Sequence, residues 1–207
     1  MTAQQAQSKR AQLQHTIRLA ALEEFASNGL HGASMQAIAN RAQIAKPKLY
    51  YYITSKEELY KDILESIVTK WGTLAFDIQN GDDPVAAISY YIDIKIRHAL
   101  ENPLECRFFS QEVARGAPVL QEHWEQSKQA VQRANAVIQS WVDAGKINPV
   151  NPTVFQMQLW AVTQHYADYE AQAKFFLDVE PCAALDPEIL IKEAQTLFLS
   201  SIRTTTG

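Results

Sequence analysis

The chain has 207 residues, of which 47% are hydrophobic and 20% charged, and its formal net charge is −4. This composition excludes a disordered chain, and no apolar run reaches the roughly 18–20 residues that a membrane helix needs. The N-terminus has no apolar signal stretch, and Cys106 and Cys182 lack the spacing of metal or redox motifs. We therefore expect a cytoplasmic protein with two ordinary thiols and no membrane partner.

Charge is unevenly distributed along the sequence. Residues 1–62 carry eight Lys and Arg against five Asp and Glu, a balance of +3, whereas the remainder carries −7. A basic first segment on an acidic body suits a protein that presents one end to phosphates. We expect two domains, residues 1–62 and residues 63–207, with the boundary inside a long helix.

Helix start and stop signals predict an all-α protein of about nine helices. Starts are marked by Asp or Asn before proline, and stops by glycine. The starts are at Asp83, Asn102, Asn151 and Asp186, and the stops are at Gly29, Gly116 and Gly145. The expected helices span residues near 10–28, 34–41, 46–52, 56–79, 84–100, 103–114, 118–144, 152–177 and 187–203.

Two short helices around residues 43–45 have the pattern of a helix-turn-helix. The second begins Lys46-Pro47-Lys48. In a major groove, Lys46 and Lys48 would bind guanine O6 and N7, and Pro47 would contact a thymine methyl. This pattern makes DNA binding the leading hypothesis.

Further side chains are candidates for the phosphate backbone. Ser34 caps the preceding helix, and Tyr50 and Tyr52 carry hydroxyls that can bind phosphates. The alternative is that Tyr51 or Tyr52 is partly buried in the core. We expect Leu49 to be a core residue. Lys9 and Arg10 form either a basic arm that orders on DNA or a disordered tail.

Residues 13–62 resemble the N-terminal domain of the TetR family of transcriptional repressors. The resemblance is carried by the segments 24–30, 34–42, 48–53 and 55–60. It implies a homodimer that binds double-stranded operator DNA and is released by a small molecule. It also implies that Tyr51 and Lys56 contact DNA.

Two positions depart from the family pattern. Gln43 stands where the family often has glycine, so the turn must be made without glycine's freedom at positive φ. Ala45 stands where Ser or Thr is common, so the recognition helix has no hydroxyl cap.

The body resembles the RutR-like subgroup of pyrimidine-utilisation regulators, which sense uracil. The matching segments are 112–120, 141–147 and 160–169. The resemblance implies a pyrimidine effector and places Trp71 in the pocket. Four further residues match subgroup positions as lining or structural residues; they are Lys95, Arg107, Phe109 and Glu112.

The helix near 152–177 carries an unusual mixed stripe. Trp160, Gln164 and Asp168 recur every four residues, with His165 beside them. An indole with neighbouring amide and imidazole groups suits a polar heterocycle. The alternative is a dimer face, since the resemblance to the TetR family implies that the helices near 152–177 and 187–203 join two subunits. For Asp168, a structural ion pair is a better expectation than a place in the pocket.

The function that we expect is a ligand-responsive DNA-binding regulator, a repressor released from a palindromic operator. A TetR-like regulator of a drug, a lipid or a purine is the alternative. A helical metal enzyme is more remote: residues 98 and 101, and 165 and 168, pair His with an acid, but the facing repeats of such sites are absent. We expect no cofactor, no metal and no catalytic residue.

Overall fold

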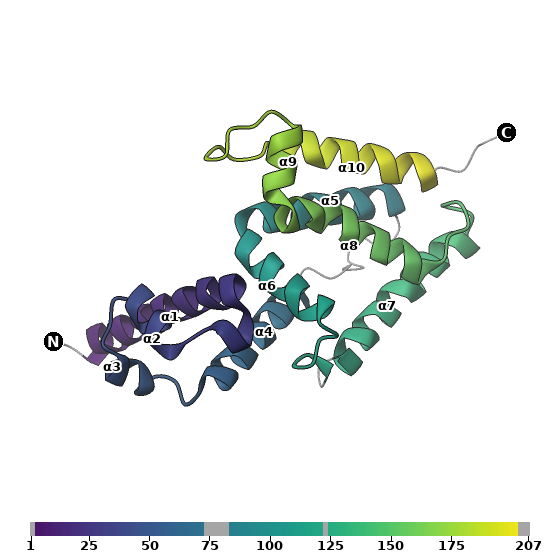
Figure 1. Cartoon of the computed structure of the whole chain (residues 1–207). Helices are drawn as coiled ribbons and strands as arrows, with labels where there is room; N and C mark the ends of the chain where they lie inside the picture. Colours follow the sequence, from purple (N-terminus) through teal and green to yellow (C-terminus); the bar gives the residue numbers. More distant parts are fainter. Residues whose placement is uncertain (1–2, 73–82, 122–123, 203–207) are drawn as a thin grey trace. The chain divides into compact units, whose positions relative to one another are not determined.

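The computed structural model describes residues 3–72, 83–121 and 124–202, which form ten helices and no strand (Figure 1). The all-α expectation is confirmed. Contacts divide the chain into two units, Met1–Val68 with Arg107–Leu120, and Thr69–Cys106 with Gln121–Gly207. The domain boundary at residue 62 stays a prediction.

The first unit begins with α1 (Ala3–Gly32), which leaves helical geometry at Gly29, where φ is 66°. Glycine reaches this positive φ without a Cβ clash, which explains the expected stop. Then follow α2 (Met35–Arg41), α3 (Lys46–Tyr50) and most of α4 (Lys56–Gly72). The expected helix-turn-helix is formed by α2, the turn after it and α3.

Three aromatic rings form the centre of the first unit. Tyr60 packs edge-on against Phe25 and Phe108, with ring centroids 5.0 and 4.7 Å away. The Tyr60 hydroxyl donates to the fully buried Glu112 carboxylate at 2.9 Å, and Arg115 also binds this carboxylate. Burial and Glu112 together raise the pKa of Tyr60, so its hydroxyl stays a donor. Glu112 is therefore a structural residue.

The second unit is built around α5 (Pro84–Glu101), which contacts α8 (Pro152–Asp168) and α10 (Pro187–Ile202). Figure 1 shows these three helices lying alongside one another. The remaining helices are α6 (Pro103–Ala114), which continues into the first unit, α7 (Trp124–Asp143) and α9 (Glu170–Phe176). In the part of the chain that the structure describes, no helix is both long and apolar enough to span a membrane.

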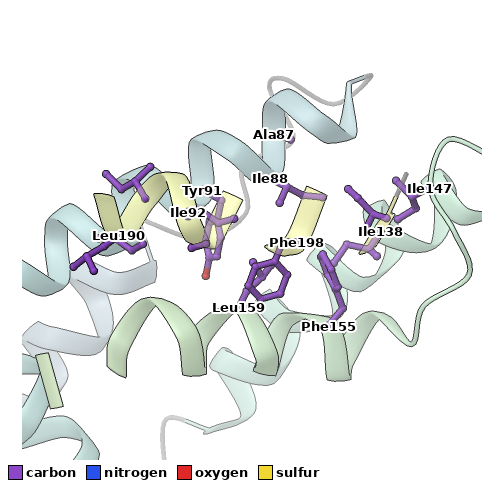
Figure 2. Close-up of a cluster of buried hydrophobic side chains, with 14 of the residues drawn as sticks. Ala87, Ile88, Tyr91, Ile92, Ile138, Ile147, Phe155, Leu159, Leu190 and Phe198 are labelled. Atoms are coloured by element: carbon purple, nitrogen blue, oxygen red, sulfur yellow. The ribbon is translucent and has the colours of Figure 1, made fainter. Parts of the chain in front are cut away.

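A large apolar cluster joins α5, α7, α8 and α10 (Figure 2). Ile88, Ile92 and Leu159 are fully buried in it, and Phe155 packs edge-on against Phe198 with ring centroids 5.7 Å apart. Burial of such side chains contributes about 1.5–3 kcal/mol each. This cluster makes the second unit a stable platform for the residues around it.

Local cap signals were largely correct. The Asp83 side chain accepts from Val85 and Ala86, and Asn151 accepts from Val154. The Asn102 amide instead donates to the His98 carbonyl, and its oxygen accepts from Lys70.

Several helix limits were wrong. The helix expected over 152–177 is two helices, because Tyr169 has φ −119° and ψ 37° and breaks the α-helical path. α1 begins at Ala3, not near residue 10, and α7 begins at Trp124, not near 118. The expected helix ends at 79 and 203 lie outside the described residues.

Candidate DNA interface and effector site

The turn between α2 and α3 is made without glycine. Gln43 takes φ 55°, and the Ile44 amide donates to the Ala39 carbonyl at 3.0 Å. Ala45 begins α3 with no side-chain hydrogen bond, as the sequence predicted. Leu49 is completely buried and anchors α3 to the first unit.

The outer face of α3 presents cations and aromatic rings. Lys46, Pro47 and Lys48 are exposed, and Lys46 Nζ lies 6.0 Å from the centre of the Tyr50 ring. Tyr51 is 73% exposed, whereas Tyr52 is half-buried and packs edge-on against it. The anchored inner face and free outer face are the geometry of a recognition helix.

Ser34 and Lys56 are brought together at the start of α2. Ser34 Oγ accepts from the Ala37 amide at 3.1 Å, and Lys56 Nζ donates to the neighbouring Ala33 carbonyl at 3.1 Å. Lys56 is half-buried, so its position is fixed by this contact. Ser34 and Lys56, both predicted to contact phosphates, therefore lie beside the N-terminus of α2.

Electrostatics favour an anionic partner for this face. Between residues 3 and 56 the sequence has only two acidic residues, Glu23 and Glu24. Both bind Arg41, at 3.4 and 3.0 Å. The acidic residues nearest in sequence to the lysines of α3 are Glu57 and Glu58, in the first turn of α4, and none lies on α3 itself.

In the second unit, Trp71 lies at the centre of a polar cluster. Its indole N–H donates to His98 Nε2 at 2.9 Å, and Lys95 Nζ lies 4.7 Å from its ring centre. Lys95 is only 8% exposed, and burial lowers its pKa. Ala99, Cys106 and Ala167 pack on the apolar side of this cluster.

The α8 stripe divides between two environments. Trp160 is half-buried, and its N–H donates to the Tyr91 hydroxyl at 3.0 Å. Gln164 is half-buried and donates to Asp168 Oδ2 at 3.4 Å. His165 is exposed, and its ring lies 5.1 Å from that of Tyr169.

The chain was compared with known proteins. A family model described as bacterial regulatory proteins, tetR family, matches residues 17–63, and one described as YcdC-like protein, C-terminal region, matches residues 64–204. The HTH-type transcriptional regulator RutR of Escherichia coli K12 is 35% identical over 192 residues, which cover 90% of this chain and 89% of RutR.

The chain belongs to the TetR family. It is a ligand-responsive, DNA-binding transcriptional regulator with a helix-turn-helix and a ligand-binding region.

Solved structures share the TetR fold. A protein described as a fatty acid metabolism regulator of Clostridium perfringens has a TM-score of 0.69 at 21% identity, covering 92% of this chain and all of that one. AibR, solved with isovaleryl coenzyme A and operator DNA, has a TM-score of 0.68 at 18% identity, covering 88% and 96%. At these identities the likeness shows the fold alone.

Among the residues predicted to line the effector site, the structure groups some and separates others. Trp71, Trp160, Gln164 and His165 belong to the second unit, whereas Phe109 groups with the first. Ala167 packs in the same apolar cluster as Trp71 and lies one helical turn from Gln164. Of the predicted residues, Trp71 and Gln164 are therefore near the same buried position. Their role in ligand binding stays a prediction.

Sequence reasoning missed the side-chain contacts around Trp71. His98 was considered only as a metal ligand, yet it accepts the Trp71 N–H. Within the described residues, no group of three or more His, Cys, Asp or Glu could hold a metal. The available signal was Lys95 and His98, three residues apart on the otherwise largely apolar buried face of α5.

Proposed function

We propose that this chain is a dimeric repressor that a small planar heterocycle releases from a palindromic operator. The observation that carries the proposal is the exposed outer face of α3, on which Lys46 and Lys48 lie together with the aromatic ring of Tyr50. It acts in the cytoplasm by binding alone, without catalysis. The ligand acts by changing how much of the operator is occupied. Binding of the ligand therefore lowers the affinity for the operator, and binding of the operator lowers the affinity for the ligand.

On the operator, α3 lies in the major groove. Lys46 and Lys48 read guanine, and Pro47 contacts a thymine methyl. The phosphate backbone of the DNA is bound by Tyr50, Tyr51, Tyr52, Ser34 and Lys56. These contacts fix the register of the protein on the duplex. Contacts to the phosphate backbone contribute affinity but do not distinguish one base sequence from another.

Dimerisation is supported by unpartnered apolar side chains on α8 and α10. Val154 and Met157 on α8 are about half exposed, as are Ile189 and Leu197 on α10. Ile189 and Leu197 are eight residues apart and so share a helix face. A second copy that packs against this face would bury them, and it would place two recognition helices on one palindrome.

The effector proposal rests on the surroundings of Trp71. This half-buried indole offers a flat apolar surface, and Gln164 offers an amide with both a donor and acceptors. A pyrimidine such as uracil presents alternating N–H and carbonyl groups at its edge, which an amide can pair. Lys95 supplies a further donor to a carbonyl oxygen.

Release follows from α4. This continuous helix begins at Lys56, a predicted phosphate contact, and contains Trp71 at its other end. A ligand that moves Trp71 therefore displaces α4 and weakens the DNA-bound arrangement. Coupling energies of this kind are typically about 1–3 kcal/mol.

Gel-shift titration of the full chain on operator DNA, with uracil, thymine, purine bases and lipophilic compounds added singly, tests the proposal. A ligand at about 100 times its dissociation constant also raises folded-state stability by about 2.7 kcal/mol. Loss of operator binding with pyrimidines alone is the expected result. Release by purines or lipophiles only would replace the pyrimidine, and an asymmetric footprint from one subunit would overturn the dimeric repressor.

The Gln164→Leu variant sharpens the effector test. Loss of the amide leaves a ring group unpaired, which costs about 1–3 kcal/mol or roughly 5–150-fold in affinity. Operator binding should be unchanged. Gln139→Leu is the matched control, because Gln139 donates in the same way to an Asp four residues on, Asp143, at 2.8 Å, on the exposed side of α7.

A further inference from the structure

The ammonium group of Lys95 is buried in the second unit without an acidic partner. Lys95 lies on α5 and is 8% exposed, and its Nζ lies 4.7 Å from the centre of the Trp71 ring. Within residues 3–72, 83–121 and 124–202, no hydrogen bond or ion pair holds this ammonium. The described part of the second unit therefore contains a buried cation whose charge no carboxylate balances.

The other buried acidic and basic side chains of the described residues all have hydrogen-bond partners. Glu24 and Glu112 each accept from an arginine, at 3.0 and 2.9 Å. His98 accepts the Trp71 N–H at 2.9 Å. Burying a charge is costly unless a partner compensates for the lost water. Lys95 is the exception among these groups, and such unbalanced groups are typical of functional sites.

Lys70 shows the pairing that Lys95 lacks. Its Nζ donates to the Glu105 carboxylate at 3.2 Å. Burial lowers the pKa of His98, and Lys70 and Lys95 lower it further. Glu105 and Glu101 oppose them by less, so the potential at this point is positive. Because Lys70 is already bound by a carboxylate, Lys95 is the cation that is left to bind an anion.

The groups around Lys95 compensate for only part of its burial. An indole face attracts a cation, but more weakly than a carboxylate at hydrogen-bond distance. Burial lowers the pKa of Lys95, and the Cys106 thiol, which packs in the same cluster as Trp71, opposes this shift. A thiol in apolar surroundings is mostly protonated at neutral pH, so it carries little negative charge.

We propose that the effector is a planar pyrimidine with a full negative charge, and that Lys95 binds this charge while Gln164 pairs with the amide edge. The inference rests on the proposed function and narrows its effector from pyrimidines in general to anionic ones. The charge lies either in the ring, as in barbiturate, or on an attached carboxylate, as in orotate. Either anion supplies the counter-charge that Lys95 lacks, whereas neutral uracil leaves the buried ammonium unbalanced.

Gel-shift titrations of the full chain on operator DNA with uracil, barbiturate and orotate test the inference. We expect at least one anion to release the operator at a concentration about tenfold or more below that of uracil. Lys95→Gln removes the charge but keeps an N–H donor for a carbonyl oxygen. This variant should need about 30-fold or more of the effective anion, while its response to uracil stays nearly unchanged.

Lys70→Gln is the matched control. It removes an equal charge from the same cluster, but one that Glu105 already binds. The preference for the anion over uracil should therefore remain. The comparison separates direct pairing with Lys95 from attraction by the overall positive field.

The ligand-free protein gives a second readout. Lys95→Met replaces the ammonium with an apolar side chain of similar length. Because an unbalanced buried charge is lost, the melting temperature should equal or exceed that of the unmodified protein. A lower melting temperature would show that the protein already balances this charge, and would overturn the inference.

Two outcomes of the titrations would overturn the inference alone. If uracil releases the operator at a concentration equal to or below that of both anions, the pyrimidine effector stands and its negative charge does not. Equal losses of the anion response in Lys95→Gln and Lys70→Gln would replace pairing with a general field. If none of the three compounds releases an operator that the protein binds, the proposed pyrimidine effector fails together with the inference.

Discussion

At the scale of single residues, Lys46 and Lys56 separate two kinds of DNA contact. Lys46 is exposed on α3, whereas Lys56 is half-buried and held on the Ala33 carbonyl. We expect Lys46→Ala to cost about 1–3 kcal/mol and to relax preference at one base pair. Affinities for single-base operator variants measure this loss. Lys56→Ala should weaken all sequences alike, and equal behaviour of the two variants would contradict the placement of α3.

His98 gives the second unit a dependence on pH. Burial, with Lys70 and Lys95 nearby, lowers the pKa of His98 below its ordinary value of 6.5. Neutral His98 accepts the Trp71 N–H, so protonation removes this acceptor. The unfolded chain takes up the proton first as pH falls through 6.5, and its greater proton binding makes folded-state stability decline.

The variant His98→Gln keeps an acceptor for Trp71 but cannot titrate in this range. We expect its stability to fall less than that of the unmodified protein between neutral and mildly acidic pH. Intrinsic fluorescence during urea unfolding measures this, because all four tryptophans, residues 71, 124, 141 and 160, belong to the second unit. Parallel pH curves for the two proteins would count against His98.

At the scale of elements, the α2–α3 turn stores backbone strain. Gln43 holds φ 55°, a left-handed conformation that costs a residue with a Cβ about 1–2 kcal/mol. Gln43→Gly removes this cost, but ordering the more flexible glycine backbone on folding costs about 0.5–1 kcal/mol, so we expect a small net stabilisation. Gln43→Val should destabilise instead, because β-branching crowds this conformation. Calorimetric melting of both variants tests the sign.

Element limits show how local signals compete with long-range packing. Caps at Asp83 and Asn151 were predictable because the side chain and its backbone partner lie within three residues. The break at Tyr169 was not, because no glycine or proline marks it. Buried Ala167 before it and Ala173 after it belong to different apolar clusters, so tertiary packing sets the direction of α9.

For the whole molecule, the exposed apolar face of α8 and α10 predicts a dimer. Leu197→Glu places a charge where the partner would pack, and we expect it to lower the dimer fraction in sedimentation experiments. Leu19→Glu is the control, because Leu19 is 47% exposed on α1 of the first unit. Operator affinity should fall with the dimer, since two half-sites about 34–36 Å apart need two linked heads. A monomer in both the unmodified protein and the variant would refute the interface.

The sequence by itself determined the helical class, the helix-turn-helix and the burial of Leu49. It also predicted a turn made without glycine at position 43 and a helix α3 that Ala45 leaves uncapped, whereas the positive φ of Gln43 came from the structure. The helix limits, the turn and the missing cap depend on residues within one or two turns of each other, and the position of Leu49 on the inner face of α3 follows from the same short pattern. The local chain chemistry is therefore enough to specify them.

Only the tertiary structure decided what the polar side chains do. Trp71 pairs with His98 across 27 positions, Trp160 with Tyr91 across 69, and Tyr60 with Glu112 across 52. A buried donor must find an acceptor, but sequence periodicity shows only which face is buried. Which faces meet depends on how the helices pack around the apolar clusters, and that packing fixed the surroundings of Trp71.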